Sequence, residues 1–181
     1  MSTALIPALR ALSDDIRHFD KGALLFAQRD KVQSLHLIET GAVHLVRHQI
    51  GGFALTLHRA DAGAILAEAS LFSERYHCDA VAQQPTRTVC IPKATVQAEM
   101  TRDPALTRAW AVFLTREVQA TRARAEILAL RTVANRLDAW LAMRGGDLPD
   151  KGGWKSVAGE IGVSAEALYR ELARRRRGNT S

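Results

Sequence analysis

Hydrophobic positions along the chain change their period twice, which predicts a helical start, a stretch of strands and a helical second half. Apolar residues at spacings of four, three and four predict a short amphipathic helix within residues 4–18: Leu5, Leu9, Leu12 and Ile16. Short apolar runs follow, most of them separated by glycine or proline: 23–26, 35–38, 43–47, 53–57 with the Gly51-Gly52 corner before it, and 89–91. This pattern predicts a β-sandwich or barrel rather than a parallel sheet.

From Pro104 the period becomes helical, and no glycine or proline interrupts it before Gly145. A narrow seam runs along residues 105–131 at spacings of three and four: Ala111, Leu114, Val118, Thr121, Ala125 and Leu128. At about 1.5 Å per residue such a helix is ~40 Å long, more than a small barrel can cover. We therefore expect the seam to pair with a second copy of the chain, the alternative being packing within one subunit. Trp110 and Phe113, beside the seam, are expected to pack on the β-domain.

A new apolar face after a bend near residues 131–132 predicts the first helix of a C-terminal domain. Residues 155–177 then predict a helix, a tight turn and a second helix, with Ser164 as the N-cap of the second. Leu168 and Leu172 form its buried stripe, and the opposite side is polar and basic: Glu166, Arg170, Ala173, Arg174 and Arg177. Such a face suits a helix that enters the major groove of DNA. The alternative is an ordinary surface hairpin with a solvated arginine tail.

Charge distinguishes the two halves of the chain. Residues 1–101 hold 10 Lys+Arg and 10 Asp+Glu, whereas residues 102–181 hold the other 15 and 9, so the whole excess of +6 lies in the second half. This distribution favours a polyanionic partner for that half, with a basic solubilising surface as the alternative. With 47% hydrophobic and 24% charged residues, the composition is that of a folded globular protein.

Several classes of protein are disfavoured. No apolar run approaches the roughly 20 residues of a membrane span, and the N-terminus lacks the features of a signal peptide, so we expect a cytoplasmic protein without a membrane partner. Cys78 and Cys90 have the spacing of neither a zinc site nor a disulfide framework. No catalytic triad, Cys/His pair or carboxylate pair can be assembled, so we expect neither an enzyme nor a metal site.

The order of these parts resembles the CRP/FNR family of bacterial transcription factors over about residues 19–177. The residues that carry the resemblance are Phe19-Asp20-Lys21-Gly22, Leu35 to Ile38 with Gly41 and Val43, Gly63, Glu68 with Leu71-Phe72, Val133-x-x-Arg136-Leu137, and Glu160-Ile161-Gly162-Val163-Ser164-x-Glu166 followed by Arg170. It implies an α+β chain: a cyclic-nucleotide-binding-like β jelly-roll over residues 1–103, a dimerisation helix over 104–131, and a helix-turn-helix domain without a full wing over 132–181. It also implies a homodimeric regulator of transcription that binds double-stranded DNA, and it allows RNA polymerase as a further partner.

The resemblance also implies an effector pocket: Ala67, Glu68, Ser70, His77, Cys78 and Thr121. Ala67 stands where the family has a glycine and His77 where it has the phosphate-binding arginine, so we expect an effector other than cyclic AMP. The cofactor stays open. Haem could bind through His77 or Cys78, and His77 and Asp79 could share an ion on an extended segment, but a polar loop with a buried cysteine is the simpler interpretation. The histidines of the strands are interpreted as surface or satisfied residues: His36, His44, His48 and His58.

The predicted DNA contacts are Lys155, Ser164, Glu166, Tyr169, Arg170, Arg174 and Arg177. Ala165 replaces an arginine with which the family reads a base, so selectivity is expected to rest on Glu166 and Arg170. No wing is expected after Arg177, and residues 174–177 are expected to supply phosphate contacts in its place. The alternative function is a module that senses a ligand, cyclic nucleotide or haem, or binds another protein, and whose DNA-binding domain is degenerate.

Overall fold

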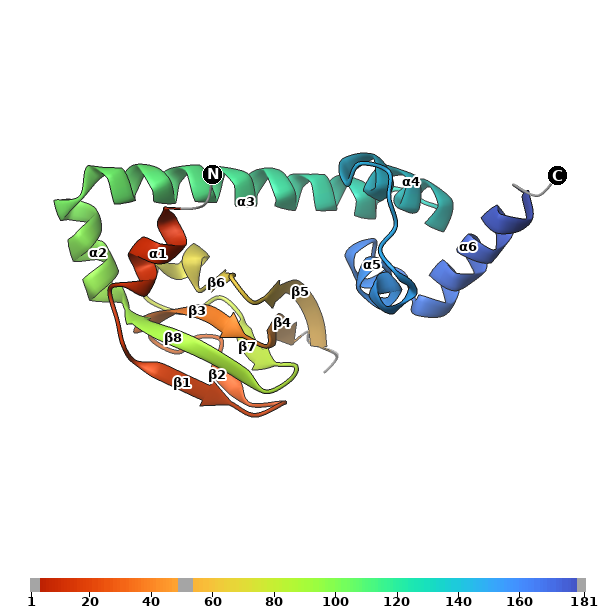
Figure 1. The fold of residues 1–181 in the computed structure, drawn as a ribbon. Coiled ribbons are helices and arrows are strands. Elements are labelled where there is room, and N and C mark those ends of the chain that lie inside the picture. The colour runs from red at the N-terminus through yellow and green to blue at the C-terminus, as the bar shows by residue number, and fades with distance from the viewer. Residues whose placement is uncertain (1–3, 49–53, 179–181) are drawn as a thin grey trace. The chain divides into compact units, whose positions relative to one another are not determined.

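The computed structural model describes residues 4–48 and 54–178 and divides the chain into two compact units, residues 1–113 and 114–181 (Figure 1). The boundary falls within helix α3 (Pro104–Ala129), which begins at the predicted proline. The predicted three-part division at residues 103 and 131 therefore stays a prediction. Among the described residues, no helix combines the length and the apolar character that crossing a membrane requires.

The first unit contains two antiparallel four-stranded sheets. In the order of hydrogen-bonded neighbours, one sheet holds β1 (Ile16–Phe19), β8 (Thr86–Pro92), β3 (Ser34–Thr40) and β6 (Ile65–Leu66). The other holds β2 (Leu24–Phe26), β7 (Asp79–Ala82), β4 (Ala42–His48) and β5 (Ala54–Asp61). Buried side chains from both sheets form one core, including Phe26, Ile38, Val43, Leu66 and Ala80. The predicted antiparallel β-fold is confirmed.

Some strands have a clear hydrophobic pattern in the sequence, and others do not. The apolar runs of β2, β3, β4 and β8 are confirmed, and the run at 53–57 belongs to β5, although Phe53 and the Gly51-Gly52 corner lie outside the described residues. Three strands were not predicted: β1, β6 and β7. Strand β7 buries only the small side chains of Ala80 and Ala82, and β6 has only two residues, so neither produces a marked hydrophobic run.

The predicted helix within residues 4–18 is wrong in its extent. Helix α1 covers only Leu5–Arg10, and Ile16 belongs to β1, where it lies opposite Val89 of β8. Ser13 explains the change of structure, because its hydroxyl donates to the carbonyl of Cys90 at 2.7 Å and accepts from the amide of Asp15 at 3.1 Å. These bonds hold the segment against the edge of β8 instead of in a helix.

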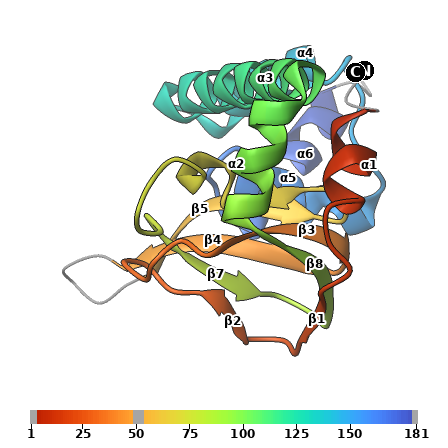
Figure 2. The same ribbon diagram turned by 90° about the vertical axis from the view of Figure 1, so that its left-hand side faces the viewer.

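Helix α2 (Lys93–Arg102) was also not predicted. It starts directly after Pro92, and Val96 is its only buried residue, so its apolar pattern is too weak to be recognised. Figure 2 shows α1 and α2 beside each other at one end of the sheets. Trp110, at the start of α3, is 2% exposed and lies 5.8 Å from the ring of Phe113 within this first unit.

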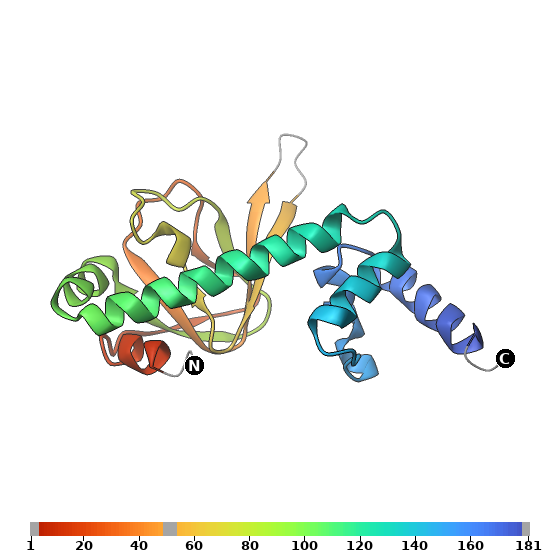
Figure 3. The same ribbon diagram turned by 90° about the horizontal axis from the view of Figure 1, so that it is seen from above.

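The second unit is helical (Figure 3). The predicted bend is confirmed, since α3 ends at Ala129 and Thr132 caps α4 (Val133–Met143) by accepting from the amide of Asn135 at 3.1 Å. A short 3-10 turn, η2 (Lys151–Gly153), leads into α5 (Trp154–Glu160), which α6 (Ala165–Gly178) follows. Their core includes Ile127, Leu137, Trp140, Val157, Ile161, Leu168 and Leu172, so the predicted stripe of α6 is confirmed.

Candidate functional site

Helices α5 and α6 form a helix-turn-helix whose turn is fixed by backbone geometry. Gly162 has φ +66°, a left-handed conformation that glycine adopts without steric cost. The amide of Val163 donates to the carbonyl of Ala158 at 2.9 Å and so closes the end of α5. Ser164 then accepts from the amide of Ala167 at 3.2 Å, which confirms the predicted N-cap of α6.

The predicted DNA contacts all lie on exposed positions of this motif: Lys155, Ser164, Glu166, Tyr169, Arg170, Arg174 and Arg177. The pKa of Glu166 is lowered, first by a hydrogen bond from its own backbone amide and then by the Ser164 hydroxyl, with a smaller effect of the Arg170 charge. Glu166 is therefore an ionised acceptor beside a guanidinium donor at neutral pH. Glu166 and Arg170 both lie on the exposed face of α6.

The four terminal arginines differ from one another in their contacts. Arg174 donates to Glu171 through Nε at 2.9 Å and Nη2 at 2.7 Å. Arg175 donates to Glu171 at 2.8 Å, to Asp138 at 2.6 Å and to the carbonyl of Ala134 at 3.0 Å. Arg175 therefore ties α6 to α4, and the expectation that residues 174–177 supply phosphate contacts stays a prediction.

An aromatic cluster flanks the same helix. The Arg176 guanidinium lies 5.2 Å from the ring centroid of Trp154, and the Tyr169 ring lies 5.6 Å from that ring. Trp154 in turn donates from Nε1 to the carbonyl of Pro149 at 2.9 Å. Tyr169 remains 40% exposed, so its phenol is positioned on one side but open to a partner on the other.

Glu171 is a structural residue that the sequence interpretation overlooked, although its spacing to Arg174 and Arg175 indicates the contacts. Its carboxylate accepts from both guanidinium groups, and these bonds lower its pKa to about 2. The pKa is lower in the folded state, so the stabilisation is complete above about pH 4.5 and is lost as the pH falls towards 2.

We expect Glu171→Gln to make the free energy of unfolding of the second unit less dependent on pH in this acidic range. The measurement is urea denaturation of wild type and variant at pH 7, 4 and 3. Glu126→Gln, at an exposed position of α3, is the control for loss of a carboxylate. Equal pH dependence in wild type and Glu171→Gln would contradict this role.

Five residues of the predicted effector pocket lie in the first unit, on the loop between β6 and β7. Ala67 precedes the 3-10 turn η1 (Glu68–Ser70), and the Ser70 hydroxyl lies 3.2 Å from Nδ1 of His77. Cys78 is 1% exposed, and burial, helped by the Glu68 charge, raises its pKa to about 11. The structure thus brings these five residues together around a neutral thiol. Thr121 belongs to the second unit and stays a prediction.

The backbone of this loop keeps a glycine-like conformation at a residue that is not glycine. Ala67 has φ +67° and ψ 15°, and its side chain is buried. A left-handed conformation costs a residue with a Cβ about 1–2 kcal/mol relative to the right-handed one. The backbone is therefore strained at Ala67, the position at which the CRP/FNR family, which this chain resembles, has glycine.

We expect Ala67→Gly to raise the free energy of unfolding of the first unit by about 0.5–1 kcal/mol, because relief of strain exceeds the entropy that glycine adds to the unfolded chain. Ala69→Gly, two residues on at an exposed position of η1, should lower it by about 0.5–1 kcal/mol. Urea denaturation of both variants gives the comparison. The strain is disproved if the two substitutions change stability in the same direction.

Arg47 of β4 is a further residue of this loop's surroundings that the sequence did not single out. Its Nη2 donates to the carbonyl of His77 at 3.0 Å. The pKa of His77 is lowered, mainly by burial and to a smaller extent by the Arg47 charge. His77 is therefore neutral at pH 7, with Arg47 and not His77 supplying positive charge to the loop.

The carboxylate of Asp79 has partners within the fold other than His77. Asp79 accepts from the amide of Gln28 at 2.6 Å and lies 3.1 Å from Nδ1 of His48. Within residues 4–48 and 54–178, no group of three or more ligating side chains is arranged to hold a metal ion. Buried His36 lies 3.3 Å from Thr88 Oγ1, and burial lowers its pKa to about 4, as expected for a satisfied neutral histidine.

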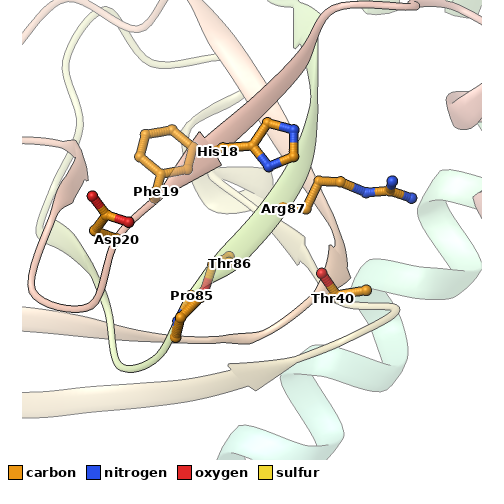
Figure 4. A pocket seen from close by; sticks show the side chains of 7 residues that line it. All are labelled: His18, Phe19, Asp20, Thr40, Pro85, Thr86 and Arg87. Carbon is orange, nitrogen blue, oxygen red and sulfur yellow. The ribbon is translucent and has the colours of Figure 1, made fainter.

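A pocket of the first unit lies at the end of β1 and the start of β8 (Figure 4). It is lined by His18, Phe19, Asp20, Thr40, Pro85, Thr86 and Arg87. Arg87 pairs with Glu39 at 2.9 Å, and Arg10 also donates to Glu39 at 2.8 Å, so the cation of this pocket is balanced from within the fold. The pocket contains none of the predicted effector residues.

The predicted seam of α3 is largely uncovered in a single chain. Val118 is 47% exposed and Leu128 38% exposed, while Leu114 is half-buried. Thr121 and Ala125 between them are also exposed. A continuous row of small and apolar groups along one helix is typical of a surface that packs against another helix.

Comparison with known proteins agrees with this geometry. Residues 16–103 match the model of the cyclic nucleotide-binding domain family. This part of the chain thus resembles a cyclic nucleotide-binding domain. Two solved structures extend the likeness beyond the domain: the c-di-GMP-responsive global regulator CLP of Xanthomonas campestris, 19% identical with a TM-score of 0.68, and FixK2 of Bradyrhizobium japonicum, 14% identical with a TM-score of 0.72. The match covers 98% of this chain and 93% of CLP, and 91% of this chain and 85% of FixK2.

The predicted fold class and the resemblance to the CRP/FNR family are thereby confirmed. The cyclic AMP receptor protein of Thermus thermophilus is 28% identical over 122 residues, which cover 67% of this chain. The chain spans little more than half of that relative, 56% of its length. Residues 16–103, which match the cyclic nucleotide-binding domain model, are thus followed by the helices of a CRP/FNR-like fold.

Proposed function

We propose that the chain is a homodimeric, sequence-selective DNA-binding regulator of transcription that responds to an effector other than cyclic AMP. The observation that carries this proposal is the exposed polar face of α6, which presents Glu166 and Arg170 while Leu168 and Leu172 are buried on its other side. A recognition helix needs such a face, because base edges in the major groove are read by hydrogen bonds from side chains.

The roles of the side chains follow from their chemistry. Arg170 can donate two hydrogen bonds to guanine, and Glu166 can accept from the amino group of cytosine. Lys155, Ser164, Arg174 and Arg177 are proposed to contact phosphates, and Tyr169 a phosphate or a thymine methyl group. Since Arg175 is bound to α4, fewer phosphate contacts are expected than the run of arginines suggests.

Dimerisation is proposed through the uncovered seam of α3: Leu114, Val118, Thr121, Ala125 and Leu128. Two copies joined there would present two recognition helices to one duplex. Binding by both requires half-sites about 34 Å apart, one turn of the DNA helix. An effector that moves the α3 helices would change this spacing and thereby the affinity.

The effector is proposed to bind at the loop of Ala67, Glu68, Ser70, His77 and Cys78, completed by Thr121. His77 is neutral, and Arg47, the cation beside this loop, already donates to the carbonyl of His77. Together with the added Cβ of Ala67, this disfavours a cyclic phosphate there. We propose a cytoplasmic protein without catalytic activity, with RNA polymerase as a further partner in regulation.

The test is an anisotropy titration of the full chain against duplexes of operator length, selected from a random library, and against random duplex at moderate salt. Tighter binding of the selected duplex supports the proposal. Equal binding of both would reject it and favour a sensing or protein-binding module whose DNA-binding domain is degenerate. Sedimentation of the protein before titration shows whether the binding species is a dimer.

A further inference from the structure

Residues 130–132 interrupt the helix between α3 and α4, where a chain could bend. One arginine, however, forms hydrogen bonds to both sides of this break. Arg136 of α4 donates from Nε to the carbonyl of Leu130 at 2.8 Å and from Nη2 to the carbonyl of Leu128 at 3.0 Å. Its Nη1 donates to the carbonyls of Ile161 and Gly162, at 3.2 and 3.0 Å. The guanidinium thus joins the end of α3 to the turn that precedes α6.

These acceptors are well matched to a guanidinium. The last carbonyls of a helix have no amide partner within the helix, and they carry its partial negative charge. Arginine offers donors in a fixed planar fork, so one side chain can bond in several directions, whereas a lysine ammonium is a single point on a flexible stem. Replacing Arg136 with lysine keeps the charge but loses the bridging geometry.

Packing reinforces the same junction. The Leu128 side chain lies against Gly162 so closely that a Cβ on the glycine would clash with it. Ile127, one residue earlier, is 4% exposed and belongs to the core formed with Leu137 and Ile161. The last turn of α3 is therefore packed onto the helix-turn-helix by side chains on both sides of the hydrogen-bonded arginine.

We propose that Arg136 locks this break, so that the last turn of α3, α4 and the turn before α6 move as one body. Arg136 is then a positioning residue for the recognition helix and not a DNA contact. A movement of α3 would pass to α6 without bending at residues 130–132. The regulatory meaning of the lock rests on the proposed function, but the lock itself is a property of the folded chain.

Hydrogen exchange of the full chain without DNA tests the lock. The amide of Leu130 donates to Ile127, and that of Val163 donates to Ala158, so each reports one side of the junction. We expect Arg136→Lys to accelerate exchange of both amides together by about tenfold or more. Thr132→Ala removes the cap of α4 but leaves the arginine in place, and should leave these two amides within about threefold of wild type. Unchanged exchange at either amide in Arg136→Lys would overturn the lock.

A second measurement separates positioning from DNA contact. Arg136→Gln, which removes the charge together with the fork, is expected to weaken binding to a selected duplex by about tenfold or more, with the slope of log K against log salt unchanged, because a positioning residue releases no counterions. A slope reduced by about one unit would make Arg136 a phosphate contact and overturn the assignment. If wild-type protein selects no duplex, the proposed function fails, and the exchange experiment alone decides whether the lock exists.

Discussion

Replacing Arg170 with alanine is expected to weaken binding to a selected operator by roughly 5- to 150-fold, which corresponds to the loss of one bidentate contact with guanine, about 1–3 kcal/mol. Binding to random duplex should change little beyond the effect of one lost charge. The reason is the position of Arg170 on the exposed face of α6, where Leu168 and Leu172 are buried on the opposite side. Anisotropy titrations of wild type and variant with both duplexes give the ratio of their dissociation constants for each duplex.

Arg116→Ala is the matched control, because it removes the same charge from an exposed position of α3 outside the motif. It should lower the affinity for both duplexes by the same small factor. If Arg170→Ala behaves as Arg116→Ala does, Arg170 does not read a base. The proposed orientation of α6 in the groove would then be wrong.

The largest structural effect is expected from Gly41→Ala, at the connection between β3 and β4. Gly41 has φ +100°, and an added Cβ would lie 2.6 Å from the Cα of Thr86 and 2.8 Å from the carbonyl oxygen of Pro85. Both are backbone atoms, so the strands themselves must move. Strain at positive φ and overpacking together should lower the free energy of unfolding of the first unit by about 2–5 kcal/mol.

Gly63→Ala separates the two causes. Gly63 has φ +89°, but its added Cβ would meet nothing within 4 Å, so only the backbone strain of about 1–2 kcal/mol is expected. Urea denaturation of both variants measures the difference, which is the steric contribution at Gly41. Equal losses in the two variants would show that the close approach of Thr86 and Pro85 is unimportant.

Elements with strong side-chain periodicity were predictable from the sequence. The long helix from Pro104, the bend before α4 and the N-cap Ser164 all depend on local chemistry, and the structure confirms them. Strand β7 and helix α2 were not predictable, because Ala80, Ala82 and Val96 bury too little apolar surface to form a pattern. Ile16 lies in a strand because it pairs with Val89, far away in the sequence.

The candidate site was predictable in its positions but not in its contacts. Every proposed DNA contact lies at an exposed position, as helical spacing indicated, and Ala67 has a left-handed backbone at φ +67°. Arg175 looked equivalent to its neighbours, and only the folded structure shows that Asp138 binds it. The sequence marked Arg136 only through the family resemblance. Its hydrogen-bond acceptors are backbone carbonyls, which every residue has, so the sequence cannot identify them.

The central claim is that two copies of this chain read one duplex, and selection of duplexes from a random library by the purified full chain tests it most directly. We expect enrichment of two-fold symmetric sequences with half-sites about 10 base pairs apart. The selected duplex should bind about 1,000-fold or more tightly than random duplex at physiological salt. A library that shows no enrichment, or a ratio of dissociation constants near one, would show that two copies of this chain do not read one duplex.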